Sequence, residues 1–526
     1  MNIQSSVLSA TPALGNRAKL PGRERSVPTL APTLADRLAF ALVAPRTWLL
    51  KLLCARFEGF VWTFRHVPPA FLAWDSAIRA RKAFHRARRK VPAYGRFVAS
   101  RPPGSIPETD KASYIRAYPV ADRCFTGRLP RREMVIDESS GSTGTPYDWV
   151  RSTSECRASH RMIGYFARHL FGPEPWITLN AFSLGAWATG LNMGQALQRV
   201  SVVKNTGPDI GKLLHTLAFF GPDRPYLLTG YPPFMKHLLD EAEARGFPLA
   251  DYRLHALVGG EGMSEGLRDY LLRHFRIVYS GYGATDLEIG VAGETPLSVA
   301  LRRLALANPA FRRRLFGEDP RLPMVFQYNP LMHHVDVNGE GELLVTLTRP
   351  GVLSPRLRYN VHDQGGTLRF DRMAELLKEQ GLVLRDLCPG YAPLQLPFLW
   401  VFGRRDHTVS IMGANIYPED LEACLYAEPD LARRTRAFCL QLAESGEHQV
   451  RPRFHFEVEG DVDDDLRRRF EAAIPARLVA LNADFREAWR EYPDAMRPEI
   501  RLHSVGEGPF AANEARIKQV RVLGTA

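Results

Sequence analysis

A loop of small hydroxyl and glycine residues at 138–146, Glu-Ser-Ser-Gly-Ser-Thr-Gly-Thr-Pro, carries groups that could hold a phosphate chain. Hydroxyls and free backbone N–H groups in a tight loop suit phosphate oxygens, and glycine lets the backbone approach a ligand closely. The loop is not a Walker A motif, because Thr145 and Pro146 follow its second glycine. By itself such a cluster is more often an ordinary turn. The candidate phosphate-binding residues are Ser139, Ser140, Gly141, Ser142, Thr143, Gly144 and Thr145.

The segment after this loop alternates short apolar runs with amphipathic stretches. The pattern predicts strands at 176–182, 200–203, 226–228, 254–258 and 276–279, with helices at 210–220 and 234–244 between them. Ser264 is expected to cap the helix after strand 254–258. Alternating strands and helices predict a mainly parallel sheet covered by helices, in which ligands bind at the carboxyl ends of the strands. Those ends carry Gly185, Gly230, Gly259, Gly260, Glu261, Gly281, Tyr282 and Gly283.

The second half of the chain changes character. Residues 322–362 predict a smaller antiparallel unit, with strands at 342–347 and 356–359. After the apolar run 398–402 comes a compact α+β pattern, with a helix that begins near Pro418. It continues with strands at 436–442, 453–458 and 498–503 and one long helix from about 463 to 490. We place a domain boundary at 403–406.

Composition limits the classes of protein to which the chain can belong. The 526 residues include 69 Lys and Arg against 57 Asp and Glu, and a surplus of twelve positive charges favours an anionic partner. Seven cations lie at 79–90 and are expected to form a solvated helix face, and no nucleic-acid-binding signature accompanies them. The six scattered cysteines have neither metal-ligand nor redox spacing, which predicts a reducing, cytoplasmic location.

The N-terminal residues show no membrane-spanning pattern. The apolar run 38–50 contains Pro45 and Arg46, whereas a spanning helix needs about 20 largely uncharged residues. Residues 1–35 are expected to be a disordered tail without a secretory signal. The aromatic-rich segment 38–75 is expected to be helical and to pack on the main body, with weak contact to a membrane surface as the lesser alternative.

Six segments in chain order carry a family resemblance. They are Ser139–Pro146, Tyr282-Gly283-Ala284-Thr285-Asp286, Gly341–Leu344, Arg358–Asp363, Gly403–Asp406 and Gly413–Pro418. The set resembles the adenylate-forming superfamily of acyl- and aryl-CoA synthetases over roughly residues 80–526. Segments Val91–Tyr94 and Ala188–Gly190 look most similar to the phenylacetate–CoA ligases within it. Each motif is weak alone, but six in order at sensible spacing are strong.

The resemblance implies a fold and a division of the chain. It implies an α/β protein: a large N-terminal domain of βα-layered sheets with a small β-barrel-like subdomain, followed by a small mobile α+β C-terminal domain. With the patterns above it divides the chain into a disordered tail at 1–35, a helical segment at 36–100, an adenylation core at 101–402 and the mobile domain at 403–526.

The resemblance also assigns roles to residues. The Ser139–Thr145 loop would hold the β- and γ-phosphates of ATP, Tyr282 would stack on adenine, and Thr285 would reach the α-phosphate. Asp286 stands where the family usually has Glu and would help to hold Mg²⁺, with Glu288 and Glu261 as alternates. Asp363 would accept hydrogen bonds from the ribose hydroxyls, with Arg404 nearby, and Asp406 matches the hinge. The implied nucleotide site further includes Gly260, Glu261, Gly283 and Ala284, and the implied acid pocket lies under Phe182, Trp187, Ala188, Gly259 and Gly260.

Three positions depart from the family pattern. Thr145 stands where many members have lysine, and His407 replaces an acid after the hinge. The catalytic lysine of the C-terminal domain aligns with Arg516, while Lys518 lies two residues later. Arginine is a planar fork and lysine a point charge, so the exchange is not neutral. Both cations therefore remain candidates, and Lys518 is favoured because a compact ammonium fits more easily between a carboxylate and a phosphate.

The resemblance predicts an enzyme that uses ATP and Mg²⁺ to make an acyl-adenylate from a carboxylic acid, aromatic or of medium length. The acyl group would then pass to coenzyme A. An amide synthetase with an amine acceptor is the alternative, and a decayed nucleotide- or nucleic-acid-binding scaffold is the alternative from another class. The expected partners are small molecules and not nucleic acid, and the expected assembly is a monomer or homodimer.

Overall fold

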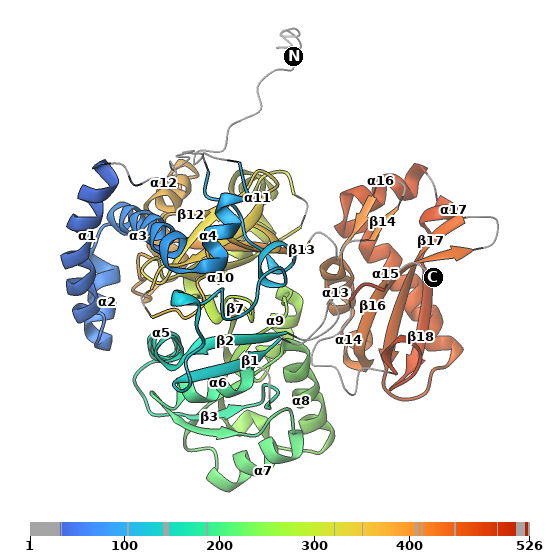
Figure 1. Cartoon of the computed structure of the whole chain (residues 1–526). Helices are drawn as coiled ribbons and strands as arrows, with labels where there is room; N and C mark the ends of the chain where they lie inside the picture. Colours follow the sequence, from blue (N-terminus) through green and yellow to red (C-terminus); the bar gives the residue numbers. More distant parts are fainter. Residues whose placement is uncertain are drawn as a thin grey trace, which may run out of the picture.

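The structure is a computed structural model that describes residues 32, 34–102, 105–139, 147–185, 188–319, 321–349, 351–404, 409–411, 414–445, 449–491, 493–511 and 521–523 (Figure 1). Its N-terminal part is helical, as the aromatic-rich sequence predicts. Four helices follow one another: α1 Leu34–Leu53, α2 Phe57–His66, α3 Pro69–Lys90 and α4 Pro92–Ala99. Among the described residues, no helix has the length and apolar character needed to cross a bilayer.

A single eleven-stranded sheet forms the centre, in the order β10-β11-β12-β13-β9-β8-β7-β6-β5-β3-β4. Its parallel part matches the predicted βα units: β3 Ile177–Asn180, β4 Val202–Asn205, β5 Pro225–Gly230, β6 Arg253–Gly259 and β7 Phe275–Ala284. The antiparallel part continues the same sheet through β8 Glu288–Gly293, β9 Met324–Tyr328, β10 His333–Val337, β11 Glu342–Leu347, β12 Tyr359–Leu368 and β13 Phe398–Arg404. A hairpin of β1 Met134–Glu138 and β2 Asp148–Ser152 lies beside it.

Helices connect these strands. They are α5 Thr153–Phe171, α6 Ala188–Leu197, α7 Ile210–Phe220, α8 Pro232–Ala244, α9 Glu265–Leu271, α10 Pro296–Ala307, α11 Pro309–Phe316 and α12 Phe370–Glu379. The cap predicted at Ser264 is confirmed, because its hydroxyl accepts a hydrogen bond from the backbone N–H of Leu267 at 3.1 Å. The fold class read from the sequence is therefore confirmed: strands alternate with helices around one large sheet.

The C-terminal part has a core of its own, which includes Phe438, Phe454, Phe456 and Phe470. Its elements are β14 Val409–Ile411, β15 Ala414–Ile416, α13 Pro418–Tyr426, α14 Pro429–Arg434, β16 Thr435–Ser445, β17 Gln449–Val458, α15 Asp464–Leu481, α16 Ala483–Glu491, α17 Pro493–Met496 and β18 Glu499–Ser504. The boundary placed at 403–406 stays a prediction, because residues 405–408 lie outside the described part of the chain.

Two expected elements differ from the structure. The single helix at 463–490 is wrong, because the chain breaks at Asn482 into α15 and α16. Asn482 adopts an extended backbone, and its side chain accepts from the Phe485 N–H at 2.9 Å, so it caps the second helix. The strand expected at 356–359 begins only at its last residue, because Arg358 has a φ of 45°, which a strand cannot accommodate.

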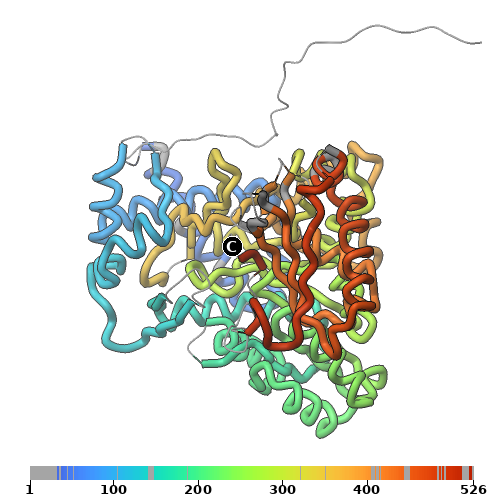
Figure 2. Tube along the Cα trace, turned by 90° about the vertical axis from the view of Figure 1, so that its right-hand side faces the viewer, coloured from blue at the N-terminus to red at the C-terminus, as the bar shows by residue number. Residues whose placement is uncertain are grey.

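The C-terminal part packs against α8 and α9 of the core. Figure 2 shows this part, coloured orange to red, on the side of the core that faces the viewer. Lys236 on α8 donates to the Thr435 carbonyl at 3.1 Å, and Glu422 on α13 accepts from the Ser264 N–H at 2.9 Å. Arg521 lies 3.7 Å from Glu261 of the core and 3.8 Å from Glu422. These contacts bring the end of the described chain beside the carboxyl end of β6.

Candidate active site

The turn between β7 and β8 carries Thr285 and Asp286, and two buried arginines hold its backbone. Arg151 on β2 donates to the carbonyl of Thr285 and, at 2.6 Å, to that of Leu287. Arg356 donates to the Asp286 carbonyl at 2.7 Å. Buried guanidinium groups that bond backbone carbonyls fix the path of a turn. The turn is therefore set by residues on β2 and before β12, far from it in the sequence.

The Asp286 carboxylate is partly exposed and has one described partner. Tyr359 on β12 donates its hydroxyl to Asp286 Oδ2 at 2.7 Å. Burial of the phenol raises the pKa of Tyr359 well above its usual value, and the negative charge of Asp286 raises it further. Tyr359 therefore stays protonated and acts as a donor that orients this carboxylate.

Tyr282 and Asp363 meet across the sheet. The Tyr282 hydroxyl donates to Asp363 Oδ2 at 2.6 Å, and the Tyr282 ring lies 5.7 Å from that of Phe326. Asp363 on β12 is the register partner of Arg404 on β13. The structure thus brings together three residues to which the family resemblance assigns adenosine contacts, although they come from separate segments of the chain.

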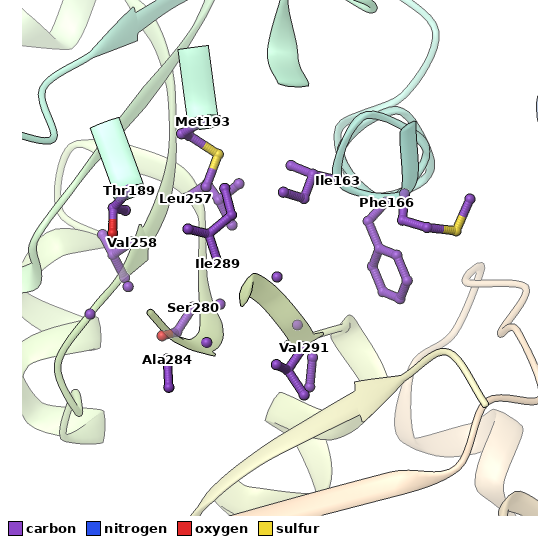
Figure 3. A pocket seen from close by; sticks show the side chains of 18 of the residues that line it. Ile163, Phe166, Thr189, Met193, Leu257, Val258, Ser280, Ala284, Ile289 and Val291 are labelled. Carbon is purple, nitrogen blue, oxygen red and sulfur yellow. The ribbon is translucent and has the colours of Figure 1, made fainter. Parts of the chain in front are cut away.

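A cavity of about 140 Å³ opens beside this turn (Figure 3). Figure 3 shows Ile163 and Phe166 of α5 on one side and Thr189 and Met193 of α6 on the other. Most of the wall is apolar, and Thr285 and Glu138 also line it, so the cavity reaches the turn between β7 and β8. Other lining residues are Ala167, Leu170, Phe182, Ala188, Tyr231, Leu257, Val258, Gly259, Gly260, Ser280, Gly281, Gly283, Ala284, Ile289, Val291 and His333.

Two glycines give the cavity its shape. Gly260 has a φ of +85°, and a Cβ there would lie 2.7 Å from the Tyr231 ring. A Cβ on Gly283 would lie 2.4 Å from the Ile289 carbonyl oxygen. Side chains at either position would force the strand ends apart. These glycines at the strand ends therefore leave backbone exposed to whatever occupies the cavity.

Glu288 forms a buried ion cluster at the cavity wall. Its carboxylate contacts Arg349 at 2.5 and 2.7 Å and is hydrogen-bonded to Nε2 of His333. Burial alone would raise the pKa of Glu288, but Arg349 and His333 lower it to about 2. Both oxygens of this carboxylate already contact cationic or polar side chains, which argues against Glu288 as an alternate magnesium ligand. Asp286 and the other alternate, Glu261, stay predictions.

The structure brings part of the predicted site together and leaves part undescribed. Phe182, Ala188, Gly259 and Gly260 all line the one cavity, and Glu261 follows them beside Arg521. Ser139 ends the described part before the loop, where its hydroxyl accepts from the Tyr147 N–H at 3.0 Å. The predicted residues outside the described part are Ser140, Gly141, Ser142, Thr143, Gly144, Thr145, Trp187, Asp406, Arg516 and Lys518, together with the side chain of Arg404.

Sequence reasoning missed the residues that position the turn. Arg151 and Arg356 lie outside the six motif segments, and Tyr359 lies within Arg358–Asp363 but has no role assigned there. Each acts on the Thr285–Leu287 turn from a distant segment. The Glu288 cluster was missed for the same reason. The one sequence signal for Arg151 is its position directly after the apolar pair Trp149 and Val150 in a short strand.

Comparison with known proteins finds solved structures that share this architecture. No protein-family model matches the chain, and no curated protein matches it in sequence. Among solved structures, 2-hydroxyisobutyryl-CoA ligase in the postadenylation state, in complex with R3-HIB-AMP, gives a TM-score of 0.63. The same ligase with 2-HIB-AMP and CoA in the thioesterification state gives 0.51.

In both comparisons the identity is 14%, and the match covers 88% of this chain and 91% of the ligase. A structural match at 14% identity shows a shared fold and no more. The predicted similarity to phenylacetate–CoA ligases stays a prediction. The chain therefore has the fold of the adenylate-forming acyl-CoA ligases, as its ordered motifs indicate.

Proposed function

We propose that this protein activates a carboxylic acid with ATP and then transfers the acyl group to a thiol, that of coenzyme A. In the first step a carboxylate oxygen attacks the α-phosphorus of ATP, the bond to the β-phosphate oxygen breaks, and pyrophosphate leaves. In the second step the thiolate attacks the acyl carbon and AMP leaves. Two anions must meet in the first step, so catalysis rests on positioning and charge neutralisation.

One observation carries the proposal: the apolar cavity ends at the Thr285–Asp286 turn, and Tyr282 of the strand before that turn bonds Asp363. An acid seated in the cavity would present its carboxylate at the turn, and adenosine contacts would lie beside it. The shared fold supports the same assignment, because the 2-hydroxyisobutyryl-CoA ligase that matches with a TM-score of 0.63 is in complex with an acyl-AMP. The resemblance in motifs supports it independently.

The residues present suit a magnesium ion. Magnesium keeps most of its water and takes one or two protein carboxylates, and Asp286 offers a partly exposed carboxylate that Tyr359 orients. Asp286 would hold the ion, which would neutralise phosphate charge. Among the described residues there is no cluster of three or more potential metal ligands, which fits an ion held mainly by its nucleotide.

A cation from the C-terminal tail would complete the adenylation site. Arg521, three residues after Lys518, contacts Glu261 beside the cavity, and three residues span at most about 11 Å. Lys518→Ala should slow acid-dependent exchange of pyrophosphate into ATP about 100-fold or more, as loss of one preorganised charge does. Arg516→Ala should slow it less. Unchanged exchange in both variants would remove the tail from the first step.

The cavity predicts the size of the acid. An apolar cavity of about 150 Å³ holds a benzene ring, so about 140 Å³ suits an aromatic or branched acyl group. Ala167→Leu on α5 should lower kcat/KM for benzoate or phenylacetate about 10-fold or more, because added methylenes fill the space that the ring needs. Acetate activation should be unaffected. Equal loss with both sizes of acid would show that the variant disturbs the fold rather than the cavity.

Pyrophosphate exchange across a panel of carboxylic acids tests the whole proposal. Acid-dependent exchange is the expected result, and its absence with every acid would favour a non-catalytic nucleotide-binding scaffold. Trials with coenzyme A and with amines, followed by mass spectrometry of the product, then separate the thioester from the amide. The proposed hinge at Asp406 belongs to the second step, since a change of domain orientation would bring the acceptor to the adenylate.

A further inference from the structure

Helix α1 is apolar on two opposite sides, and only one of them is covered. Val43 and Leu50 are buried, so the inner side packs on the body. Arg46 is exposed at the boundary between the two sides, 5.6 Å from the Phe71 ring and 5.8 Å from that of Trp74 on α3. The outer side exposes six large apolar residues, from 51% at Leu52 to 76% at Leu34. A helix that is apolar all round is normally buried. The outer side of α1 therefore needs a partner.

The exposed residues form one stripe. At 100° per residue, Leu34, Leu38, Leu42, Trp48, Leu49 and Leu52 fall within about a third of the helix circumference. We call these six residues the α1 stripe. Arg37 and Arg46 are both exposed and fall just outside its two edges. Leucines and a tryptophan between flanking arginines are the arrangement of a helix that lies in a lipid interface.

The first three helices as a whole carry the same signals. Trp62 on α2 and Trp74 on α3 are also exposed, and tryptophan favours the boundary between water and acyl chains. Residues 34–90 contain twelve Lys and Arg against three Asp and Glu, which accounts for nine of the net twelve charges of the chain. Two of the acids are already engaged: Glu58 pairs with Arg168 at 3.2 Å and Asp75 with Arg79 at 2.6 Å.

We propose that the α1 stripe docks the protein on an anionic lipid surface. The leucines and Trp48 enter the interface, while Arg37 and Arg46 meet the head groups. Figure 1 places α1 at the outer edge of the molecule, with α3 on its inner side and β16, β17 and β18 on the far side. Docking through α1 would leave both the cavity and the C-terminal part facing away from the membrane.

Charge decides between a lipid surface and a second copy of the chain. In a two-fold dimer the stripe would meet itself, so Arg37 and Arg46 at its edges would approach the same two cations of the other copy. An anionic bilayer instead attracts them, and each Lys or Arg near such a surface strengthens binding about fivefold. The observed combination of exposed leucine, exposed tryptophan and cationic surplus fits the lipid surface.

Vesicle flotation of the full chain tests the inference. The protein should float with vesicles of phosphatidylcholine and phosphatidylglycerol, float less with phosphatidylcholine alone, and be released by salt. The triple variant Leu38→Glu, Leu42→Glu, Leu49→Glu should lower the partition of the protein onto vesicles at least 100-fold. Three apolar side chains that the lipid interface would bury are then lost. Arg37→Glu with Arg46→Glu should remove most of the preference for anionic lipid.

A matched control uses exposed apolar residues elsewhere. Val202→Glu, Phe219→Glu and Leu481→Glu replace three comparably exposed side chains on β4, α7 and α15, far from α1, and should float like the wild type. Absence of flotation by the wild type, or equal loss in control and α1 variants, would overturn the proposal. A change from dimer to monomer in the α1 variant, without any flotation by the wild type, would assign the stripe to a second copy instead.

The result is independent of the enzymatic proposal. Pyrophosphate exchange by the α1 variant should equal that of the wild type, since no residue of the stripe lines the cavity. Flotation without exchange in the wild type would contradict the proposed activity alone, and exchange without flotation would contradict docking alone.

Discussion

Replacing Asp363 with alanine is expected to abolish adenylate formation through a loss of nucleotide binding, without unfolding the protein. Two charge-assisted hydrogen bonds to ribose hydroxyls contribute about 1.5–3 kcal/mol each, so ATP binding should weaken 100-fold to 1,000-fold or more. Asp363 lies on β12 beside β13, and the Tyr282 hydroxyl bonds it at 2.6 Å. Calorimetric titration with ATP and pyrophosphate exchange measure the two parts of this expectation.

The control for Asp363 is Tyr282→Phe, which keeps the ring and removes its hydrogen bond to the carboxylate. We expect this variant to retain ATP binding within about 10-fold, because one neutral donor to a charged acceptor is lost. If Asp363→Ala leaves ATP affinity unchanged, the carboxylate does not bind ribose. If both variants lose affinity equally, the Tyr282–Asp363 bond acts as a structural unit instead.

Replacing Glu288 with glutamine is expected to lower the free energy of unfolding by about 3–5 kcal/mol, because it leaves Arg349 buried without its counter-charge. The effect should depend on pH. The folded-state pKa of about 2 lies below the ordinary value of 4.5, so the unfolded state binds the proton more readily. The charge on Glu288 therefore stabilises the protein above about pH 4.5, and that contribution is lost as the pH falls toward 2.

Urea unfolding of the wild type and the Glu288→Gln variant at several pH values measures this difference. The difference in free energy of unfolding should be full near pH 7. It should shrink below pH 4.5, where the Glu288 carboxyl takes up a proton in the unfolded wild type while it stays charged in the folded state. Glu58→Gln is the control, because Glu58 forms an exposed pair with Arg168 that contributes at most about 1 kcal/mol. A gap that does not change with pH would mean that packing, not charge, is lost.

The sequence determined the local elements and the list of motifs. Helix α7 has the predicted bounds, and the Ser264 cap is where the pattern places it, because both depend on neighbouring residues. The parallel pairing of β3 to β7 followed from alternating βα units, whereas their order in the sheet did not. Glycines at strand ends also predicted where backbone would be open to a ligand, and Gly259, Gly260, Gly281 and Gly283 all line the cavity.

Only the tertiary structure decided which of these residues meet. Arg151, Arg356 and Tyr359 act on one turn because β2 and β12 run beside it, and no spacing along the chain encodes that contact. The burial of Glu288 with Arg349 and His333 likewise depends on segments 45 and 61 residues away. The uncovered side of α1 is the clearest case: the sequence predicts that this segment packs on the main body, and only the assembled fold shows that one side of the helix stays exposed. The spacing of apolar residues shows which side chains favour burial, whereas the fold decides whether other parts of the same chain bury them.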